Sequence, residues 1–210
     1  MIFKNRKDAG EKLAQKLHAY RNRPQTIVLG LPRGGVVTAA CVAHDLNLPL
    51  DMLVTQKMGA PHNPELAIGA VDEKGHMVLN QELIDLLHIS KDYVAQVKHK
   101  EQMEASLQLK KFRGSKPPLI LKNKTAILID DGLATGATMR AAIASAKAKQ
   151  SKKIIVAVPV ASPEILDQLK EEVDEIVACY VPMNLGAVGM YYEDFDQTED
   201  EEVITLLMGK

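Results

Sequence analysis

Short apolar runs and longer amphipathic stretches alternate along this chain. The runs at 26–30, 126–130, 154–160 and 175–181 show no regular polar alternation. Strands of this kind, separated by helical patterns, are typical of a parallel sheet that is covered on both faces. The pattern therefore predicts an α/β fold with a central, mainly parallel sheet flanked by helices.

Apolar residues spaced three or four apart among charged residues predict the helices. An opening helix is expected over 5–20, and Ser90 is placed to cap a long helix from Lys91 to about Lys111. Thr198 is expected to cap the last helix of the chain. The long helix is poor in apolar residues, so it is expected to project from the body. Further helices are expected at 36–46, 81–88, 136–149, 163–171 and 199–207.

The pattern is less regular over residues 50–118, between the first strand and helix and the later run of strands and helices. A second strand is predicted over 50–59, and a β-hairpin is predicted over 67–80 with its turn at Asp-Glu-Lys-Gly. Two prolines and an asparagine within 60–65 predict a loop between them. A glycine and a proline pair within 112–118 end the long helix. Because no linker or internal repeat interrupts the pattern, 1–210 is interpreted as one domain.

Charge and cysteine content exclude several classes of protein. The 26 Lys and Arg against 27 Asp and Glu predict no binding to nucleic acid or a membrane through overall charge. No run reaches the roughly 20 apolar residues that cross a bilayer, and the N-terminus lacks the apolar core of a signal peptide. Cys41 and Cys179 lie in apolar stretches, which predicts small core residues and no disulfide. Together these features predict a cytoplasmic protein.

Two local charge runs stand out against this balance. Residues 98–124 hold eight Lys and Arg against two Glu, and residues 193–202 hold seven acids and no base. Both runs are interpreted as solvated faces. For the basic run, attraction of a phosphate is the alternative.

The stretch ILIDDGLATGAT, residues 127–138, carries the candidate chemistry. Asp130 and Asp131 stand where a predicted strand ends, and ligands of open α/β sheets bind beyond the carboxyl ends of strands. Adjacent carboxylates repel each other unless cations such as Mg²⁺ or hydroxyl donors such as a ribose diol engage them. The small-residue turn that follows opens a helix, which suits a phosphate, and Thr135 and Thr138 add hydroxyl donors.

Other ligand-binding motifs fit this stretch less well. A Walker A loop requires lysine where Ala137 stands. A Rossmann fingerprint requires a glycine spacing that Gly132 and Gly136 do not have. An aspartyl-phosphate enzyme would carry Asp-x-Asp after the strand, whereas here the acids are adjacent. A strand-turn-helix without a ligand would leave the two acids unexplained.

The same stretch resembles the motif with which type I phosphoribosyltransferases bind 5-phosphoribosyl 1-diphosphate (PRPP). The resemblance implies a glycosyltransferase, more narrowly a pentosyltransferase, that transfers 5-phosphoribosyl from PRPP to a nitrogen base, with Mg²⁺ as cofactor and pyrophosphate as product. Asp130 and Asp131 would hold the ribose 2′- and 3′-hydroxyls and the metal. The substrate-binding residues implied are Gly34, Gly35, Asp130, Asp131, Gly132, Ala134, Thr135, Gly136, Ala137 and Thr138, of which Thr135, Gly136 and Thr138 would hold the 5′-phosphate.

A second loop, GLPRGG at 30–35, follows the first parallel strand and opens a helix. In the family, a loop at this place binds pyrophosphate, often through an unusual backbone conformation. The Arg33 guanidinium is a forked donor that suits a diphosphate, and Lys57 stands at a family-like position for another such contact. The catalytic set is therefore Arg33 and Lys57, which would stabilise the departing pyrophosphate, with Asp130 and Asp131, which would orient the ribose.

The family also carries a flexible loop that closes over the substrate. Within a helical insertion over 81–118, the best candidate for this loop is 109–118, because basic residues there adjoin glycine and proline hinges. Closing it would bring Lys110, Lys111 or Arg113 towards the diphosphate.

Recognition of the acceptor base is assigned to a hood over 182–210, which includes the C-terminal helix, either alone or together with the N-terminal helix. Tyr191, Tyr192 and Phe195 are interpreted either as a stacking surface for a flat ring or as core and lid packing. Ala134 stands where phosphoribosyltransferases for 6-oxopurines commonly have an acid. An alanine at this position is closer to the pattern of the adenine-type enzymes of the family.

The stretches GLPRGG, ELAIGAV, DDGLATGATMRAA and DFDQTEDEEV also resemble a bacterial group of predicted phosphoribosyltransferases. The expected partners are PRPP and a small nitrogen base, and a homodimer is one state that the resemblance implies. The alternative function is a PRPP-sensing regulatory protein that keeps the site without catalysis. A regulator that binds nucleic acid would be expected to carry a helix-turn-helix domain or a markedly basic face, so the enzyme is preferred.

Overall fold

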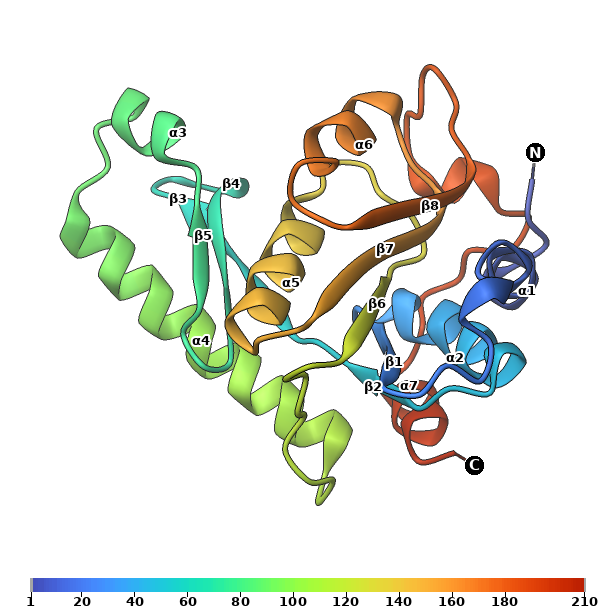
Figure 1. Ribbon diagram of the computed structural model, residues 1–210. Helices are drawn as coiled ribbons and strands as arrows, with labels where there is room; N and C mark the ends of the chain where they lie inside the picture. The colour runs from blue at the N-terminus through green and yellow to red at the C-terminus, as the bar shows by residue number, and fades with distance from the viewer. Residues whose placement is uncertain (1, 210) are drawn as a thin grey trace.

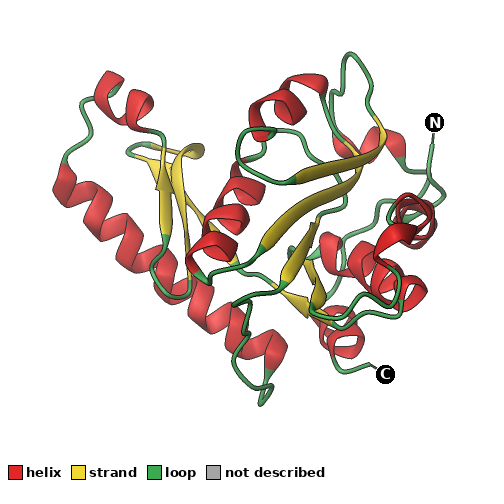
Figure 2. Ribbon diagram, viewed as in Figure 1, coloured by secondary structure: helices red, strands yellow, loops and turns green. Residues whose placement is uncertain are grey.

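The computed structural model describes residues 2–209, except for the side chain of Glu65. Its centre is a five-stranded sheet in the order β2-β1-β6-β7-β8, in which every neighbouring pair is parallel. The α/β fold with a central parallel sheet is thus confirmed (Figures 1 and 2). The strands are β1 (Thr26–Gly30), β2 (Leu50–Met52), β6 (Thr125–Ile129), β7 (Lys153–Val160) and β8 (Glu175–Tyr180).

Helices cover both faces of this sheet. Successive residues of a strand point to opposite faces, so the uninterrupted apolar strands bury both. In β6, Ile127 and Ile129 belong to the core under α1 and α2, whereas Ala126 and Leu128 belong to the core under α5 and α6. The covering helices are α1 (Arg6–Lys16) and α2 (Gly34–Leu46) on one face and α5 (Ala137–Ala148) and α6 (Pro163–Leu169) on the other.

The two cysteines lie at the edge of this core. Cys41 and Cys179 are free and half-buried, and burial raises the pKa of both thiols, that of Cys179 to about 11. The prediction of small core residues therefore holds only in part, because neither side chain is fully enclosed.

A second, antiparallel sheet in the order β3-β4-β5 stands beside the parallel one (Figure 1). The single strand predicted over 50–59 is wrong, because the chain leaves the parallel sheet after Met52 and β3 pairs with β4 instead. The hairpin predicted over 67–80 is confirmed as β4 and β5, whereas the loop predicted over 60–65 is reduced to a turn at 61–62. The strands of this sheet are β3 (Thr55–Ala60), β4 (Asn63–Asp72) and β5 (Met77–Leu79).

Two helices flank the small sheet, α3 (Gln81–Leu86) and the 23-residue α4 (Lys91–Arg113). The cap of α4 is as predicted, because Ser90 Oγ accepts a hydrogen bond from the Tyr93 N–H at 3.2 Å. As expected, α4 projects from the parallel sheet and runs along the side of the small sheet that faces away from α5 (Figure 1). No helix within the described chain is long and apolar enough to cross a membrane.

The carboxyl end of α4 returns to the parallel sheet, where Arg113 is 8% exposed. Its Nε and Nη2 donate to the two carboxylate oxygens of Asp51 in β2 at 2.8 and 2.7 Å, and Nη2 also donates to the Pro117 carbonyl at 2.7 Å. The flexible loop predicted over 109–118 is therefore wrong in its first half, which is helical and ends in a buried ion pair. The following segment, 114–120, leads to the amino end of β6 and so to the edge of the sheet opposite the predicted site (Figure 1).

The ends of the chain lie beside the parallel sheet. The helix predicted over 5–20 stops at Lys16 and continues as a short 3-10 helix, η1 (His18–Tyr20). After β8 come the 3-10 helix η2 (Val188–Tyr191) and α7 (Asp200–Leu207), which packs beside α2 and β2. Thr198 is not the cap of α7: Glu199 takes that position, without a side-chain hydrogen bond.

A buried polar cluster joins the small sheet to α5. Asp72, at the end of β4, is fully buried and accepts hydrogen bonds from Ser145 Oγ at 2.6 Å and Lys149 Nζ at 2.9 Å. His76 Nδ1 lies 2.8 Å from the same carboxylate oxygen. Burial alone would raise the pKa of Asp72, but these three hydrogen bonds outweigh it and lower the pKa to about 2. The cluster therefore holds the ionised carboxylate against α5.

Asp72→Asn is expected to lower the free energy of unfolding at neutral pH by on the order of 2 kcal/mol, since the carboxylate pKa lies well below its unfolded value. A depressed pKa adds stability that is complete above the unfolded pKa of 3.8 and is lost as the pH falls through about 2. The difference between wild type and variant in urea denaturation should therefore shrink between about pH 4 and pH 2. The exposed Glu104→Gln on α4 is the control, and equal stability of wild type and Asp72→Asn at neutral pH would contradict the prediction.

Candidate functional site

The candidate site begins where β6 ends, because Asp130 and Asp131 follow Ile129 at the carboxyl edge of the parallel sheet. The Asp131 N–H donates to Asp130 Oδ1 at 2.9 Å, so one oxygen of Asp130 is used within the turn. Burial and then the negative charge of Asp131 raise the pKa of the Asp130 carboxyl well above its usual range. A bound cation or hydroxyl donors would offset the unfavourable energy of this pair.

The loop after the acids is anchored at its middle and open at its end. Leu133 is buried, and its N–H donates to the Val160 carbonyl at 2.8 Å, which ties the loop to β7. Ala134 and Thr135 remain exposed. Gly136 precedes α5 with φ +73°, a backbone conformation that favours glycine. The exposed residues therefore lie at the start of α5, where the first N–H groups have no partner within the helix.

The 30–35 loop packs directly on the two acids. A Cβ at Gly35 would lie 2.8 Å from both Asp130 Cα and the Ile129 carbonyl oxygen, and a Cβ at Gly34 would lie 2.0 Å from Asp131 Oδ2. Only glycine fits this approach without displacing the acids. The loop also has the unusual backbone that the resemblance implied, since its Pro32–Arg33 peptide bond is cis.

Arg6 and Tyr192 hold Asp131 through contacts that the sequence did not predict. Arg6 Nε donates to Asp131 Oδ2 at 2.7 Å, with side chains 13% and 17% exposed. The Tyr192 hydroxyl donates to the Asp131 backbone carbonyl. Arg6 begins a charged amphipathic helix more than a hundred residues away along the chain, so no local signal distinguishes it from a solvated arginine.

Arg33 and Lys111, both predicted diphosphate contacts, share one acid at the start of α7. Arg33 Nη1 lies 3.5 Å from Asp200 Oδ1, and Lys111 Nζ donates to the other oxygen of this carboxylate. The hydrogen bond from Lys111 lowers the pKa of Asp200, and the same bond raises the pKa of Lys111. The structure therefore places two cations together beside the 30–35 loop, while Arg113 belongs to the core.

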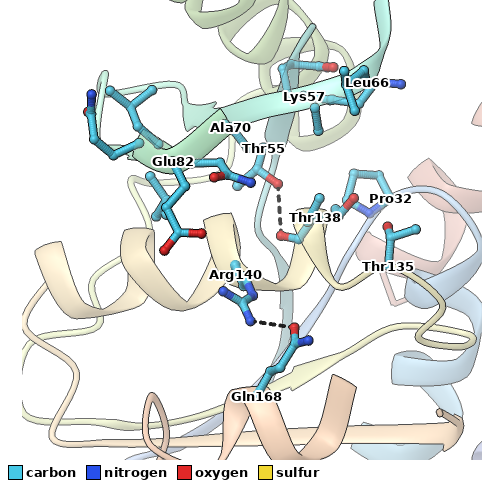
Figure 3. Close-up of a pocket in the computed structure, with 18 of the residues that line it drawn as sticks. Pro32, Thr55, Lys57, Leu66, Ala70, Glu82, Thr135, Thr138, Arg140 and Gln168 are labelled. Carbon is cyan, nitrogen blue, oxygen red and sulfur yellow. Dashed lines mark hydrogen bonds between the residues drawn. The ribbon is translucent and has the colours of Figure 1, made fainter. Parts of the chain in front are cut away.

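A cleft of about 1280 Å³ separates the start of α5 from the small sheet (Figure 3). Thr135, Ala137 and Thr138 line one wall together with Pro32, and Lys57 lines the opposite wall. Thr55 Oγ1 lies 3.5 Å from the Thr138 carbonyl and bridges the walls at one point. The cleft continues along α5 to Arg140, whose Nη2 donates to Gln168 Oε1 at 2.9 Å.

Lys57 reaches this cleft from β3, which the sequence alone did not distinguish from β2. The strand predicted over 50–59 would place Lys57 near its end, whereas Lys57 lies within β3 opposite Ala70 of β4. Among the predicted catalytic and substrate-binding residues, Lys57, Thr135, Ala137 and Thr138 line the cleft. The others lie in the 30–35 loop and in the loop between β6 and α5, and they are not among its lining residues.

The aromatic residues of the 182–210 segment form a cluster of their own. Tyr192 is buried, with ring centroids 5.3 Å from Phe3 and 4.8 Å from Phe195. Tyr191 lies 5.6 Å from Tyr180. Of the two roles considered for these rings, the structure shows packing. The segment still adjoins the site, because Val188 fills the space beside Gly132, where a Cβ would lie 2.3 Å from it.

The acids of the site do not form a metal cage by themselves. Within the part of the chain that the structure describes, no group of three or more His, Cys, Asp and Glu side chains is placed to hold a metal ion. Mg²⁺ characteristically keeps several waters and binds through one or two carboxylates plus substrate phosphates. Asp130 and Asp131 could serve as these one or two carboxylates, and a ligand would supply the phosphates.

Comparisons with known proteins agree with this geometry. A family model described as a phosphoribosyl transferase domain matches residues 1–194. Two Mycobacterium tuberculosis proteins, from strains CDC 1551 and H37Rv and provisionally described as phosphoribosyl transferases, are each 40% identical over 206 residues, 98% of this chain. The chain spans only 46% of their length. The crystal structure of TT1426 from Thermus thermophilus is 39% identical, with a TM-score of 0.87 over 100% of this chain and 99% of that one.

Proposed function

Because this chain belongs to the phosphoribosyl transferase domain family, we propose that it transfers the 5-phosphoribosyl group of PRPP to a nitrogen base, with Mg²⁺ as cofactor and release of pyrophosphate. The observation that carries the proposal is the meeting of two loops at one edge of the sheet. Gly34 and Gly35 lie on the two acids, and the threonines of the second loop open onto the cleft. One ligand with a diol, a phosphate and a diphosphate would engage all of these features.

The ribose phosphate would bind along the β6–α5 loop. Carboxyl oxygens accept hydrogen bonds, so Asp130 and Asp131 would receive the 2′- and 3′-hydroxyls. Bound Mg²⁺ would favour the ionised form of Asp130 against its raised pKa. The hydroxyls of Thr135 and Thr138, together with the first N–H groups of α5, would receive the 5′-phosphate. The exposure of Thr135 and Thr138 supports this assignment.

The diphosphate would lie between the 30–35 loop and β3. Arg33 has five N–H donors, and Asp200 engages one nitrogen at 3.5 Å, which leaves donors for a phosphate. Lys57 would approach from the opposite wall of the cleft. Bound Mg²⁺ would supply further positive charge to the diphosphate oxygens. Arg33 and Lys57 would stabilise the negative charge that develops as the bond between the anomeric carbon and the diphosphate breaks.

The acceptor would approach the ribose from the side of Ala134, which is exposed in the loop that follows the acids. A ring nitrogen of the base would form the new bond to the anomeric carbon as pyrophosphate leaves. Asp130 and Asp131 would hold the ribose in place and lie close to the positive charge that develops on it. Alanine at position 134 provides no charged partner for the base.

The wild-type protein is expected to bind PRPP in calorimetry with Mg²⁺, and chelation with EDTA is expected to weaken this binding. A pyrophosphate-release assay over a panel of nitrogen bases then tests transfer. Release with one base supports the enzyme, whereas PRPP binding without release from any base favours the regulatory alternative. Absence of PRPP binding under these conditions would contradict the proposal.

A further inference from the structure

The C-terminal segment 191–196, here called the strap, is fastened to the N-terminus just before α1. The Phe3 N–H donates to the Tyr191 carbonyl at 2.7 Å, the Glu193 N–H donates to the Phe3 carbonyl at 2.8 Å, and the Asp194 N–H donates to the Lys4 carbonyl at 2.9 Å. These bonds place the strap beside the first turn of α1. The second half of the strap, 194–196, begins a stretch, DFDQTEDEEV, to which the proposed reaction gives no role.

The strap encloses Arg6, the first residue of α1. The Phe195 ring covers the guanidinium, with Cζ 3.9 Å from the ring centroid, and Nη1 donates to the Asp196 carbonyl at 2.7 Å. The preceding Asn5 caps α1 by accepting from two backbone N–H groups, which fixes the point from which Arg6 extends. Stacking and forked hydrogen bonds together define the orientation of a guanidinium better than a single contact does.

The guanidinium held in this way fixes Asp131. Nε donates to Asp131 Oδ2, and the strap residue Tyr192 donates to the Asp131 backbone carbonyl. Gly34 lies against the same ion pair, since a Cβ there would be 2.5 Å from Arg6 Nε. Asp131 is thus fixed through both its carboxylate and its backbone by contacts that lead to the strap.

We propose that Arg6 is a positioning residue of the ribose subsite, oriented by the strap so that it engages Asp131 Oδ2 and leaves Oδ1 to accept a ribose hydroxyl. The inference rests on the proposed function, because it assumes that Asp131 binds ribose. A purely structural ion pair would hold α1 to the sheet without affecting which sugar hydroxyls the site recognises. The two roles therefore differ in how binding responds to removal of one hydroxyl.

The test uses ribose 5-phosphate and its 2-deoxy and 3-deoxy analogues as calorimetric probes. In the wild type, loss of the hydroxyl that Asp131 holds is expected to weaken binding about tenfold. In Arg6→Gln this penalty is expected to fall to about twofold or less, because the hydroxyl acceptor is no longer oriented. Lys7→Gln, at the adjacent exposed residue, is the matched control. It should lose as much affinity as the wild type when a sugar hydroxyl is removed.

The outcomes separate this inference from the proposed function. If the wild type shows a hydroxyl penalty and Arg6→Gln keeps it, Arg6 is structural and the inference is overturned. If the wild type binds neither PRPP nor ribose 5-phosphate, the proposed function falls, and this inference falls with it. Should Arg6→Gln not fold, Phe195→Leu removes the covering ring but keeps the guanidinium, and it is expected to reduce the penalty in the same direction. An unreduced penalty in that variant would likewise overturn the inference.

Discussion

Asp131→Asn is expected to weaken PRPP binding about a hundredfold in calorimetry with Mg²⁺, because hydrogen bonds to a charged group contribute up to about 3 kcal/mol. Asparagine keeps the shape of the side chain but removes the charge that faces Arg6 and a bound cation. It also presents an amide group that can turn an N–H donor towards the ribose, where an acceptor is required. Under the proposed function, the substitution is therefore expected to weaken binding of both the metal and the ribose hydroxyls.

The control for this variant is Asp167→Asn, which removes an exposed acid that pairs with Lys170 on the surface of α6. Both variants should be shown to be folded by their thermal unfolding before binding is compared. PRPP affinity equal to that of the wild type in Asp131→Asn would show that the ribose binds elsewhere. The same result would remove the basis for a positioning role of Arg6.

Arg113→Met is expected to lower the free energy of unfolding by about 3–5 kcal/mol, because it leaves the buried Asp51 carboxylate without its partner. The pair is bidentate, at 2.8 and 2.7 Å, and joins the end of α4 to the edge strand β2. Lys110→Met, an exposed residue of the same helix turn, is the control. Urea denaturation at neutral pH measures the difference.

The double variant Asp51→Leu/Arg113→Met is expected to recover most of the lost stability, because removing both charges avoids the unpaired buried acid. This prediction also distinguishes the structure from the sequence interpretation. A flexible-loop arginine that reaches the diphosphate would weaken PRPP binding when replaced and would leave stability unchanged. That result for Arg113→Met would contradict the buried pair.

The arrangement of the 127–138 candidate site was predictable because its parts are adjacent in the chain. A strand of uninterrupted apolar residues ends at Ile129, and two acids and a small-residue turn follow within one connection. The carboxyl edge of a parallel sheet is a general ligand position, so local pattern and fold class point to the same place. The same reasoning placed the 30–35 loop, whose contact with the acids the structure shows.

The small sheet was harder to predict because strands of two different sheets follow each other with little interruption. Residues 50–59 read as one strand, and only their partners show that β2 joins β1 and β3 joins β4. The cluster around Asp72 also could not be read from neighbouring residues, since Ser145 and Lys149 approach from a helix far along the chain. Packing across the whole molecule decides which strands pair. The strand propensity of a short segment carries no information about that packing.

The sequence by itself determined the parallel sheet, the two loops and the acids and threonines that they carry, because apolar period and short motifs act over a few neighbouring residues. Only the tertiary structure decided what surrounds those residues. Contacts of Arg6 with Asp131, of Asp200 with Arg33 and of Arg113 with Asp51 join positions between 62 and 167 residues apart. A charged side chain has the same local pattern whether it faces water or a buried partner, so its role is set by where the folded chain places its partner.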